Sequence, residues 1–339
     1  MKPVFVHFRA SVAFTLIALV AGYLVAGVQG AVTVAFLTAL ETSLSFDNAV
    51  VNAAVLNSWD EVWRRRFLVW GMAIAVFGMR LVFPLLIVGV VGDMSPLHAL
   101  DLALNSPDEY GRVLASAHHR ISAFGGAFLM MVFLKFFVDK HKTEHWLRSI
   151  EKPLTRLGKL EAIEAAITLA LVVLVSHLLE PALRGDFVSA GVWGVITYIL
   201  AKGVAALVGG DEEEASVGQH VVRQGIGGFL YLELLDASFS FDGVIGAFAM
   251  TNNLIVIALG LGAGAMFVRS FTLLLVERGT LNTYRYLEHG AFWAIGALAG
   301  IMLFGAHYES PEAVTGLLGA ALIVLSLGSS ILFNRKNRV

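Results

Sequence analysis

The chain has 339 residues, of which 57% are hydrophobic and only 15% are charged, whereas a soluble domain carries about 25% charged residues. The apolar residues gather in runs of 18 or more, long enough to cross ~30 Å of hydrocarbon. The composition therefore excludes an ordinary soluble protein and predicts an all-α, polytopic membrane bundle. The net charge of −2 gives no sign of a nucleic-acid partner, and the absence of cysteine excludes disulfides and thiolate metal sites.

The hydropathy pattern predicts about ten spans within a single integral membrane domain, 1–339. The first apolar stretch is too long for a signal peptide and lacks a clear cleavage site, so we expect it to be a permanent span. The short Gln29-Gly30 break after it predicts a tight helical hairpin. The predicted spans cover about 10–29, 31–56, 67–91, 121–138, 160–179, 187–209, 225–250, 254–276, 287–306 and 313–333.

The distribution of basic residues predicts the orientation of these spans. With ten spans, eighteen Lys and Arg residues fall on the side that holds both termini, and only Arg112, Arg120 and Arg184 fall on the other. Cytoplasmic loops carry the excess of positive charge, so we expect both termini in the cytoplasm. The loop 92–120 then faces outward, and the basic segment 139–159 lies on the anionic inner leaflet.

An acidic motif lies in the middle of an apolar run and occurs twice. The first copy reads Glu41-Thr-Ser-Leu-Ser-Phe-Asp47-Asn48, and the second reads Asp236-Ala-Ser-Phe-Ser-Phe-Asp242-Gly243. A carboxylate at the centre of a membrane span costs roughly 2.5–3.5 kcal/mol on insertion scales, so such residues are functional by default. The matched pair marks the candidate functional site.

The two copies belong to a longer internal repeat. The motifs are offset by 195 residues, and the pair Gly71 and Arg80 is echoed by Gly260 and Arg269. Since the offset is five spans, an odd number, the two copies cross the membrane in opposite directions. The sequence therefore predicts two inverted five-span halves, 1–180 and 181–339, whose motif helices meet near the midplane, as in many transporters.

The motif offers carboxylate, hydroxyl, amide and carbonyl oxygens, which suit Mg²⁺, Ca²⁺ or Mn²⁺ better than Zn²⁺ or Cu⁺. Residues six positions apart lie about 120° apart around a straight helix, so we expect the Ser-x-Ser segment to loosen the helix and turn both acids towards one point. So many acids cannot all stay ionised at close range without a cation. This predicts exchange of a divalent metal ion for protons, without a permanently bound cofactor.

The candidate metal ligands are the motif acids and one amide. We predict as ligands Glu41, Asp47, Asn48, Asp236 and Asp242. We predict as supporting residues Ser43, Ser45, Glu233, Ser238, Ser240, Arg80 and Arg269. In a purely structural alternative, the two arginines pair with acids, but this pairing absorbs only one acid in each half.

The two motifs resemble the signatures of the TerC family of integral membrane proteins, in its DUF475 branch. The second signature extends from Leu235 through Asp242 to Thr251, and the likeness covers about residues 10–333. Two features depart from the commoner TerC pattern, which usually has Ser at Gly243 followed by Ile-Pro. The resemblance implies a bacterial inner-membrane protein, distantly related to LysE-type exporters, with the motif acids as the site of a transported ion. Family members with assigned transport are manganese exporters, so Mn²⁺ is favoured and Ca²⁺ is the alternative.

Two other functions compete with metal export. Family association suggests a non-transporting membrane scaffold in tellurite or envelope-stress resistance. Two membrane aspartates could also form the dyad of an intramembrane aspartyl protease, but the chain has neither a Tyr-Asp nor a Gly-x-Gly-Asp motif. We therefore expect a transporter rather than an enzyme, with the divalent ion and the lipid bilayer as its partners.

Overall fold

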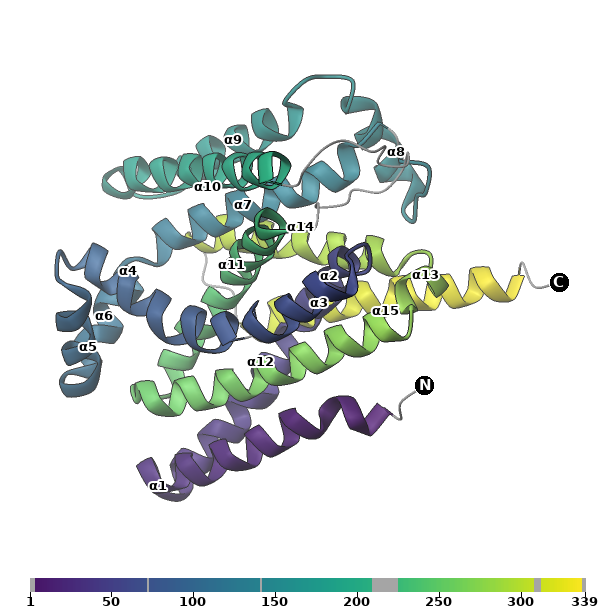
Figure 1. The fold of residues 1–339 in the computed structure, drawn as a ribbon. Helices are drawn as coiled ribbons and strands as arrows, with labels where there is room; N and C mark the ends of the chain where they lie inside the picture. Colours follow the sequence, from purple (N-terminus) through teal and green to yellow (C-terminus); the bar gives the residue numbers. More distant parts are fainter. Residues whose placement is uncertain (1–3, 72, 141, 209–224, 308–311, 337–339) are drawn as a thin grey trace.

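The computed structural model describes residues 4–71, 73–140, 142–208, 225–307 and 312–336, and every regular element in them is a helix. Figure 1 shows the helices, most of which run along one common direction. In chain order they are α1 Val4–Leu44, α2 Phe46–Leu56, α3 Glu61–Arg66, η1 Phe67–Gly71, η2 Ile74–Val82, α4 Phe83–Val91, α5 Pro96–Asn105, α6 Pro107–Ser116, α7 His118–Val138, α8 Arg148–Leu157, α9 Ile163–Ser176, α10 Pro181–Val208, α11 Ile226–Met250, α12 Leu254–Glu277, α13 Thr280–Thr283, α14 Leu287–Gly305 and α15 Glu312–Lys336.

Seven helical segments of the described chain are long and apolar enough to cross a membrane. They are Val4–Leu44, Glu61–Val91, His118–Val138, Pro181–Val204, Leu254–Glu277, Leu287–Gly305 and Leu317–Lys336. The helices α2 and α9 are apolar but shorter, and α11 carries three acids along its length. The chain is therefore an all-helical protein of the membrane-spanning type, while the number of ten spans stays a prediction.

The helix α1 folds back on itself at Ala26 and Gly27, where the backbone leaves the helical region. Gly27 has φ +62°, which glycine adopts without the strain that a Cβ would cause. Beyond this turn the two arms touch, since a Cβ on Gly30 would collide with the carbonyl oxygen of Gly22. The tight hairpin predicted from the sequence is present, three residues before the expected Gln29-Gly30 break.

The predicted span 67–91 is not one regular α-helix. Its first two parts, η1 and η2, are π-helical, and only α4 at its end is an α-helix. A π-helix makes i→i+5 hydrogen bonds, is rare, and frequently occurs at functional sites. The irregular winding matters because η2 carries Arg80.

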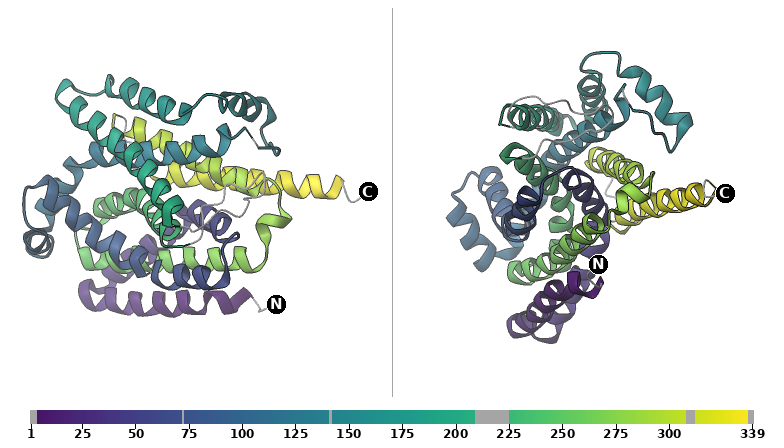
Figure 2. Two further views of the ribbon diagram at one scale, coloured as in Figure 1. Left: turned by 45° about the horizontal axis from the view of Figure 1, so that its top comes forward. Right: turned by 45° about the vertical axis from the view of Figure 1, so that its right-hand side comes forward.

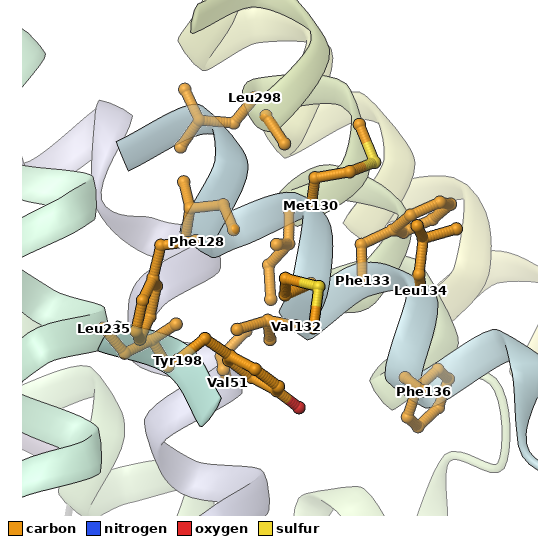
Figure 3. Close-up of a cluster of buried hydrophobic side chains, with 14 of the residues drawn as sticks. Val51, Phe128, Met130, Val132, Phe133, Leu134, Phe136, Tyr198, Leu235 and Leu298 are labelled. Carbon is orange, nitrogen blue, oxygen red and sulfur yellow. The ribbon is translucent and has the colours of Figure 1, made fainter. Parts of the chain in front are cut away.

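The helix α7 forms the centre of the bundle and packs against α10, α14, α9 and α11. Figure 3 shows its buried side chains, among them Phe128, Met130 and Phe133, surrounded by residues of neighbouring helices. Val51 of α2 and Leu235 of α11 belong to the same cluster. This hydrophobic core therefore fixes both motif helices at residues beside their polar side chains.

The two ends of the bundle carry different segments. The start of α1, the end of α15, α8 and α13 lie at one end, and α5 and α6 lie at the other (Figures 1 and 2). The loop 92–120 thus holds two short helices, and its Tyr110 is fully buried beside Phe248 at the end of α11. The segment 139–159 contains α8, whose basic side chains are exposed while Glu151 is fully buried against the bundle.

Candidate cation site between the two motif helices

The first motif spans a break between two helices. The second arm of α1 ends at Leu44, α2 begins at Phe46, and Ser45 between them is a turn residue. The Ser45 hydroxyl donates to Glu41 Oε1 at 2.8 Å, and both side chains are buried. The loosening that the sequence predicts at Ser-x-Ser is therefore found in the first copy, at its second serine.

Glu41 forms a buried ion pair with Arg80. Each side chain is only 2% exposed, and the guanidinium of Arg80 donates to Glu41 Oε1 and to the carbonyl oxygen of Ala75. The helix α12 covers the other side of the acid, since a Cβ on Gly264 would lie 2.5 Å from Glu41 Cβ. The arginine therefore holds one motif acid of the first half, as the structural alternative requires.

The two motif helices run antiparallel and touch at two levels. Asn48 of α2 donates its side-chain amide to Asp236 Oδ1 of α11. At the other level, a Cβ on Gly243 would lie 3.0 Å from Glu41 Oε2. The residue number falls from 48 in α2 to 41 in α1 while it rises from 236 to 243 along α11, which defines opposite directions. In contrast to the first copy, α11 is continuous through its motif.

One pair of contacts between the two motif regions follows the sequence offset. The offset of 195 takes Glu41 to Asp236 and Asn48 to Gly243, so it converts one of the two crossing contacts into the other. Two further contacts follow it only in part. The Thr38 hydroxyl donates to the carbonyl of Gly260 at 3.2 Å, and Glu233, which is 195 residues after Thr38, lies beside Gly71, where a Cβ would be 2.6 Å from Glu233 Oε1; Gly71 and Gly260 are 189 residues apart.

Four buried carboxyl groups surround the crossing. Asp47, Glu41, Asp236 and Glu233 are each between 2% and 7% exposed. Arg80 interacts electrostatically with Glu41 and Asp236, Asp47 with Glu41, and Glu233 with Asp236. One guanidinium cannot balance four carboxylates, so the cluster requires protons or cations wherever more than one of these acids is ionised.

The predicted set of metal ligands is only partly assembled in the described part of the chain. Glu41, Asp47, Asn48 and Asp236 lie around the crossing, but no three acidic or histidine side chains there are grouped closely enough to hold a metal ion. The side chains of Ser240 and Asp242 lie outside the described residues. By the register of the crossing, the backbone of Asp242 is level with Thr42 of α1, which lies across the break at Ser45 from Asp47.

The remaining supporting residues donate to backbone carbonyls. The exposed Ser43 donates to Ala39 O at 2.8 Å, and Ser238 donates to Leu234 O at 2.9 Å, each within its own helix. Arg269 of α12 donates from Nε to Leu68 O of η1 at 2.6 Å and so links two distant segments. These three side chains support helices near the site.

The sequence reasoning missed Asn52. This residue is 4% exposed, and its Oδ1 has no hydrogen-bond partner among the described residues. It lies one turn after Asn48 on the same face of α2. An amide four residues beyond a motif amide, within an apolar run, is the signal that would have identified it.

Comparison with other proteins places the chain in a family. Neither the curated proteins nor the solved structures include a significant match. Residues 46–337 match the model of a family described as "Protein of unknown function (DUF475)". The match includes Asp47, Asn48 and the whole second motif, and since it covers most of the sequence, the chain belongs to the DUF475 family.

Proposed function

We propose that the protein is an inner-membrane exporter of divalent metal cations, with the crossing of the two motif helices as its ion site. One observation carries the proposal: four buried carboxyl groups lie where the first motif, on α1 and α2, meets α11, and Arg80 interacts with two of them, Glu41 and Asp236. Acids inside a membrane bundle are costly and mark ion pathways. A purely structural pairing with Arg80 accounts for Glu41 and leaves the other three.

The same excess of acids supports coupling to protons. Without a cation, repulsion and burial favour the protonated forms of several of these carboxyl groups. A divalent ion that enters the cluster then displaces protons. Proton antiport is therefore the coupling that we propose, with no enzymatic step.

An inverted repeat is the architecture that we propose for this site. The antiparallel crossing and its pair of offset-related contacts support it, and inverted-repeat transporters place their substrate at such an interface. The basic residues gather on the side of both termini, which supports a cytoplasmic location of both ends. Together with the resemblance to TerC proteins and the LysE-type exporters, this favours export from the cytoplasm.

Manganese is the favoured substrate and calcium the alternative. The side chains at the crossing offer carboxylate, amide and hydroxyl oxygens, which are hard ligands suited to Mn²⁺ and Ca²⁺. The chain has no cysteine that would favour Zn²⁺ or Cu⁺. The choice of Mn²⁺ over Ca²⁺ rests on the TerC resemblance.

Flux in liposomes tests the function. We expect purified protein to carry Mn²⁺ across the membrane in one direction and protons in the other. We expect Asp47→Asn and Asp236→Asn to abolish both fluxes. Asp242→Asn belongs in the same series. Glu109→Gln, which changes an exposed acid of α6, is the matched control and should transport normally.

The outcomes separate the competing functions. Flux that is unchanged in all three aspartate variants would refute the site, while transport itself would stand. Absence of flux for Mn²⁺ and Ca²⁺, with normal metal tolerance in a deletion strain, would instead favour a scaffold. Cleavage of a membrane peptide would favour the protease.

A further inference from the structure

We propose that Asn48, Asn52 and Glu233 form a second cation position, one helical turn towards the cytoplasmic end from the crossing. This inference rests on the proposed function and orientation, and it assigns the ion a binding step before it reaches the motif acids. The position would receive a divalent cation on the cytoplasmic side.

Buried oxygen atoms that lack donors mark this position. Asn48 Oδ1, Asn52 Oδ1 and both carboxylate oxygens of Glu233 have no hydrogen-bond partner among the described residues. The three side chains are 1%, 4% and 6% exposed. Buried polar atoms are almost always paired, so a concentration of unpaired acceptors indicates a missing donor or cation.

The register of the two helices brings Asn52 and Glu233 to neighbouring levels. Asn48 contacts Asp236, and α2 and α11 are antiparallel, so one turn further along α2 brings Asn52 level with residue 232 of α11. Asn52 shares a face of α2 with Asn48, and Glu233 shares a face of α11 with Asp236. The Glu233 carboxylate also lies beside Gly71 of η1, where a Cβ would be 2.6 Å from Oε1, so η1 borders the same position.

The hydrogen bond to Asp236 fixes the orientation of the Asn48 amide. Its Nδ2 donates to Asp236, which leaves Oδ1 as the free atom. A carboxylate with two amide oxygens forms a set of acceptors that suits a hard cation and repels an anion. Since the set holds a single acid, it neutralises a divalent ion only in part and favours its onward movement to the crossing.

The position has no counterpart in the repeat among the described side chains. The offset of 195 takes Asn52 to Ala247 and relates Glu233 to Thr38. The Thr38 hydroxyl is satisfied, because it donates to Val34 O at 2.7 Å and to Gly260 O at 3.2 Å. Within the part of the chain that the structure describes, the unpaired oxygens of Asn48, Asn52 and Glu233 therefore lie on the side of the crossing where the charge distribution places the cytoplasm.

Binding and flux measured from each side of the membrane test the inference. The probe is Mn²⁺ itself, whose six-line electron paramagnetic resonance signal falls when the ion binds to protein in nanodiscs. We expect Glu233→Gln and Asn52→Leu to weaken binding by at least about tenfold, since even changes beside a ligand cost about 10–100-fold in metal affinity. In inside-out vesicles the same variants should raise the Mn²⁺ concentration for half-maximal flux, with a smaller effect on the maximal rate.

Matched variants keep the result interpretable. Thr38→Val alters the repeat-related position and should leave the apparent Mn²⁺ affinity unchanged, and Glu233→Asp should restore part of it. Wild-type affinity in folded Glu233→Gln and Asn52→Leu protein would overturn this inference, while loss of flux in Asp47→Asn would still support the proposed function. A wild-type protein that neither binds nor carries Mn²⁺ or Ca²⁺ would overturn both.

Discussion

At the scale of single residues, Arg80 is the cation that fixes the site in the absence of an ion. It donates hydrogen bonds to Glu41 and to the carbonyl oxygen of Ala75, and it interacts electrostatically with Asp236. Since both members of the ion pair are almost completely buried, each depends on the other to offset the cost of leaving water. The pair therefore matters for stability as well as for the charge balance of the site.

Removal of this arginine should destabilise the protein strongly. We expect Arg80→Met to lower the free energy of unfolding by about 3–5 kcal/mol, because it leaves Glu41 buried without its partner. The double variant Arg80→Met with Glu41→Gln should recover part of the loss. Denaturant titration in detergent micelles measures both, and equal stability of the single variant and the wild type would show that the pair carries no net interaction.

Lys142, which follows the C-terminal end of α7, predicts how the stability of the protein depends on pH. Its Nζ lies 3.6 Å and 4.0 Å from the ring centroids of Phe136 and Phe137 and 4.0 Å from Glu151 Oε2. Burial lowers the pKa of Lys142 from 10.5 to about 7, although the charges of Glu151, Glu288 and Asp139 act in the opposite direction. The side chains of His145 and His289 also face Glu151.

The sign of this pH effect follows from the difference in bound protons. Between about pH 7 and pH 10.5 the unfolded chain keeps the Lys142 proton and the folded chain loses it, so stability rises with pH by at most ~1.4 kcal/mol per unit. We expect Lys142→Met to remove this rise from the thermal unfolding profile, and Lys140→Met, at an exposed neighbour, to retain it. Parallel profiles for Lys142→Met and the wild type would contradict the assignment.

At the scale of elements, the paired helices α5 and α6 cover the end of the bundle away from the termini. Tyr110 of α6 is completely buried, and its ring lies 5.4 Å from that of Phe248. Its hydroxyl has no hydrogen-bond partner among the described residues. Burial raises the pKa of Tyr110, so the phenol stays neutral. Tyr110 therefore stabilises the packing of α6 against α11 through its ring.

Two substitutions at Tyr110 distinguish the contribution of the ring to stability from that of the hydroxyl. We expect Tyr110→Phe to leave stability unchanged or slightly higher, because an unpaired buried hydroxyl is itself unfavourable. Tyr110→Ala should cost about 3–5 kcal/mol, the usual range for an aromatic side chain removed from a core. Thermal unfolding of the two variants measures the difference, and a large loss in Tyr110→Phe would reveal a partner for the hydroxyl.

The positions of the helices were largely predictable from the sequence, because runs of apolar residues define them. The internal winding was not. Nothing in the hydropathy of 67–91 indicates π-helical turns, and the two similar motifs differ in the structure, with a break at Ser45 and a continuous α11. Packing against other helices decides where a helix breaks or changes its winding, and the hydropathy pattern along one helix carries no information about that packing.

The site shows the same limit. Repetition of the acids identified Glu41, Asp47 and Asp236 as candidates, because charges within apolar runs need a reason. The partners of these acids were not predictable in the same way. The level at which two distant helices cross decides which side chains meet. It brings Asn48 to Asp236 and leaves Asn52 with an unpaired oxygen.

At the scale of the whole molecule, the arrangement of segments agrees with the order of predicted loops. The start of α1, α8 and the end of α15 share one end of the bundle, and α5 and α6 occupy the other (Figure 1). Segments expected on the same side of a membrane are thus together. The basic residues predict that the end with both termini faces the cytoplasm.

The absence of cysteine makes a test of this orientation direct. A single cysteine introduced by Ser116→Cys, in α6, should react with a membrane-impermeant maleimide in intact cells. One introduced by Ser149→Cys, in α8, should react only after the membrane is opened; both serines are exposed. The reverse labelling pattern would contradict the orientation that we propose.

The break at Ser45 also has a mechanical consequence. Of the two contacts with the continuous helix α11, the one from Glu41 to Gly243 belongs to α1 and the one from Asn48 to Asp236 belongs to α2. Two helices joined by a turn residue can tilt relative to each other, whereas a continuous helix moves as one rod. A change of the angle at Ser45 would therefore alter one contact with α11 while the other stays in place.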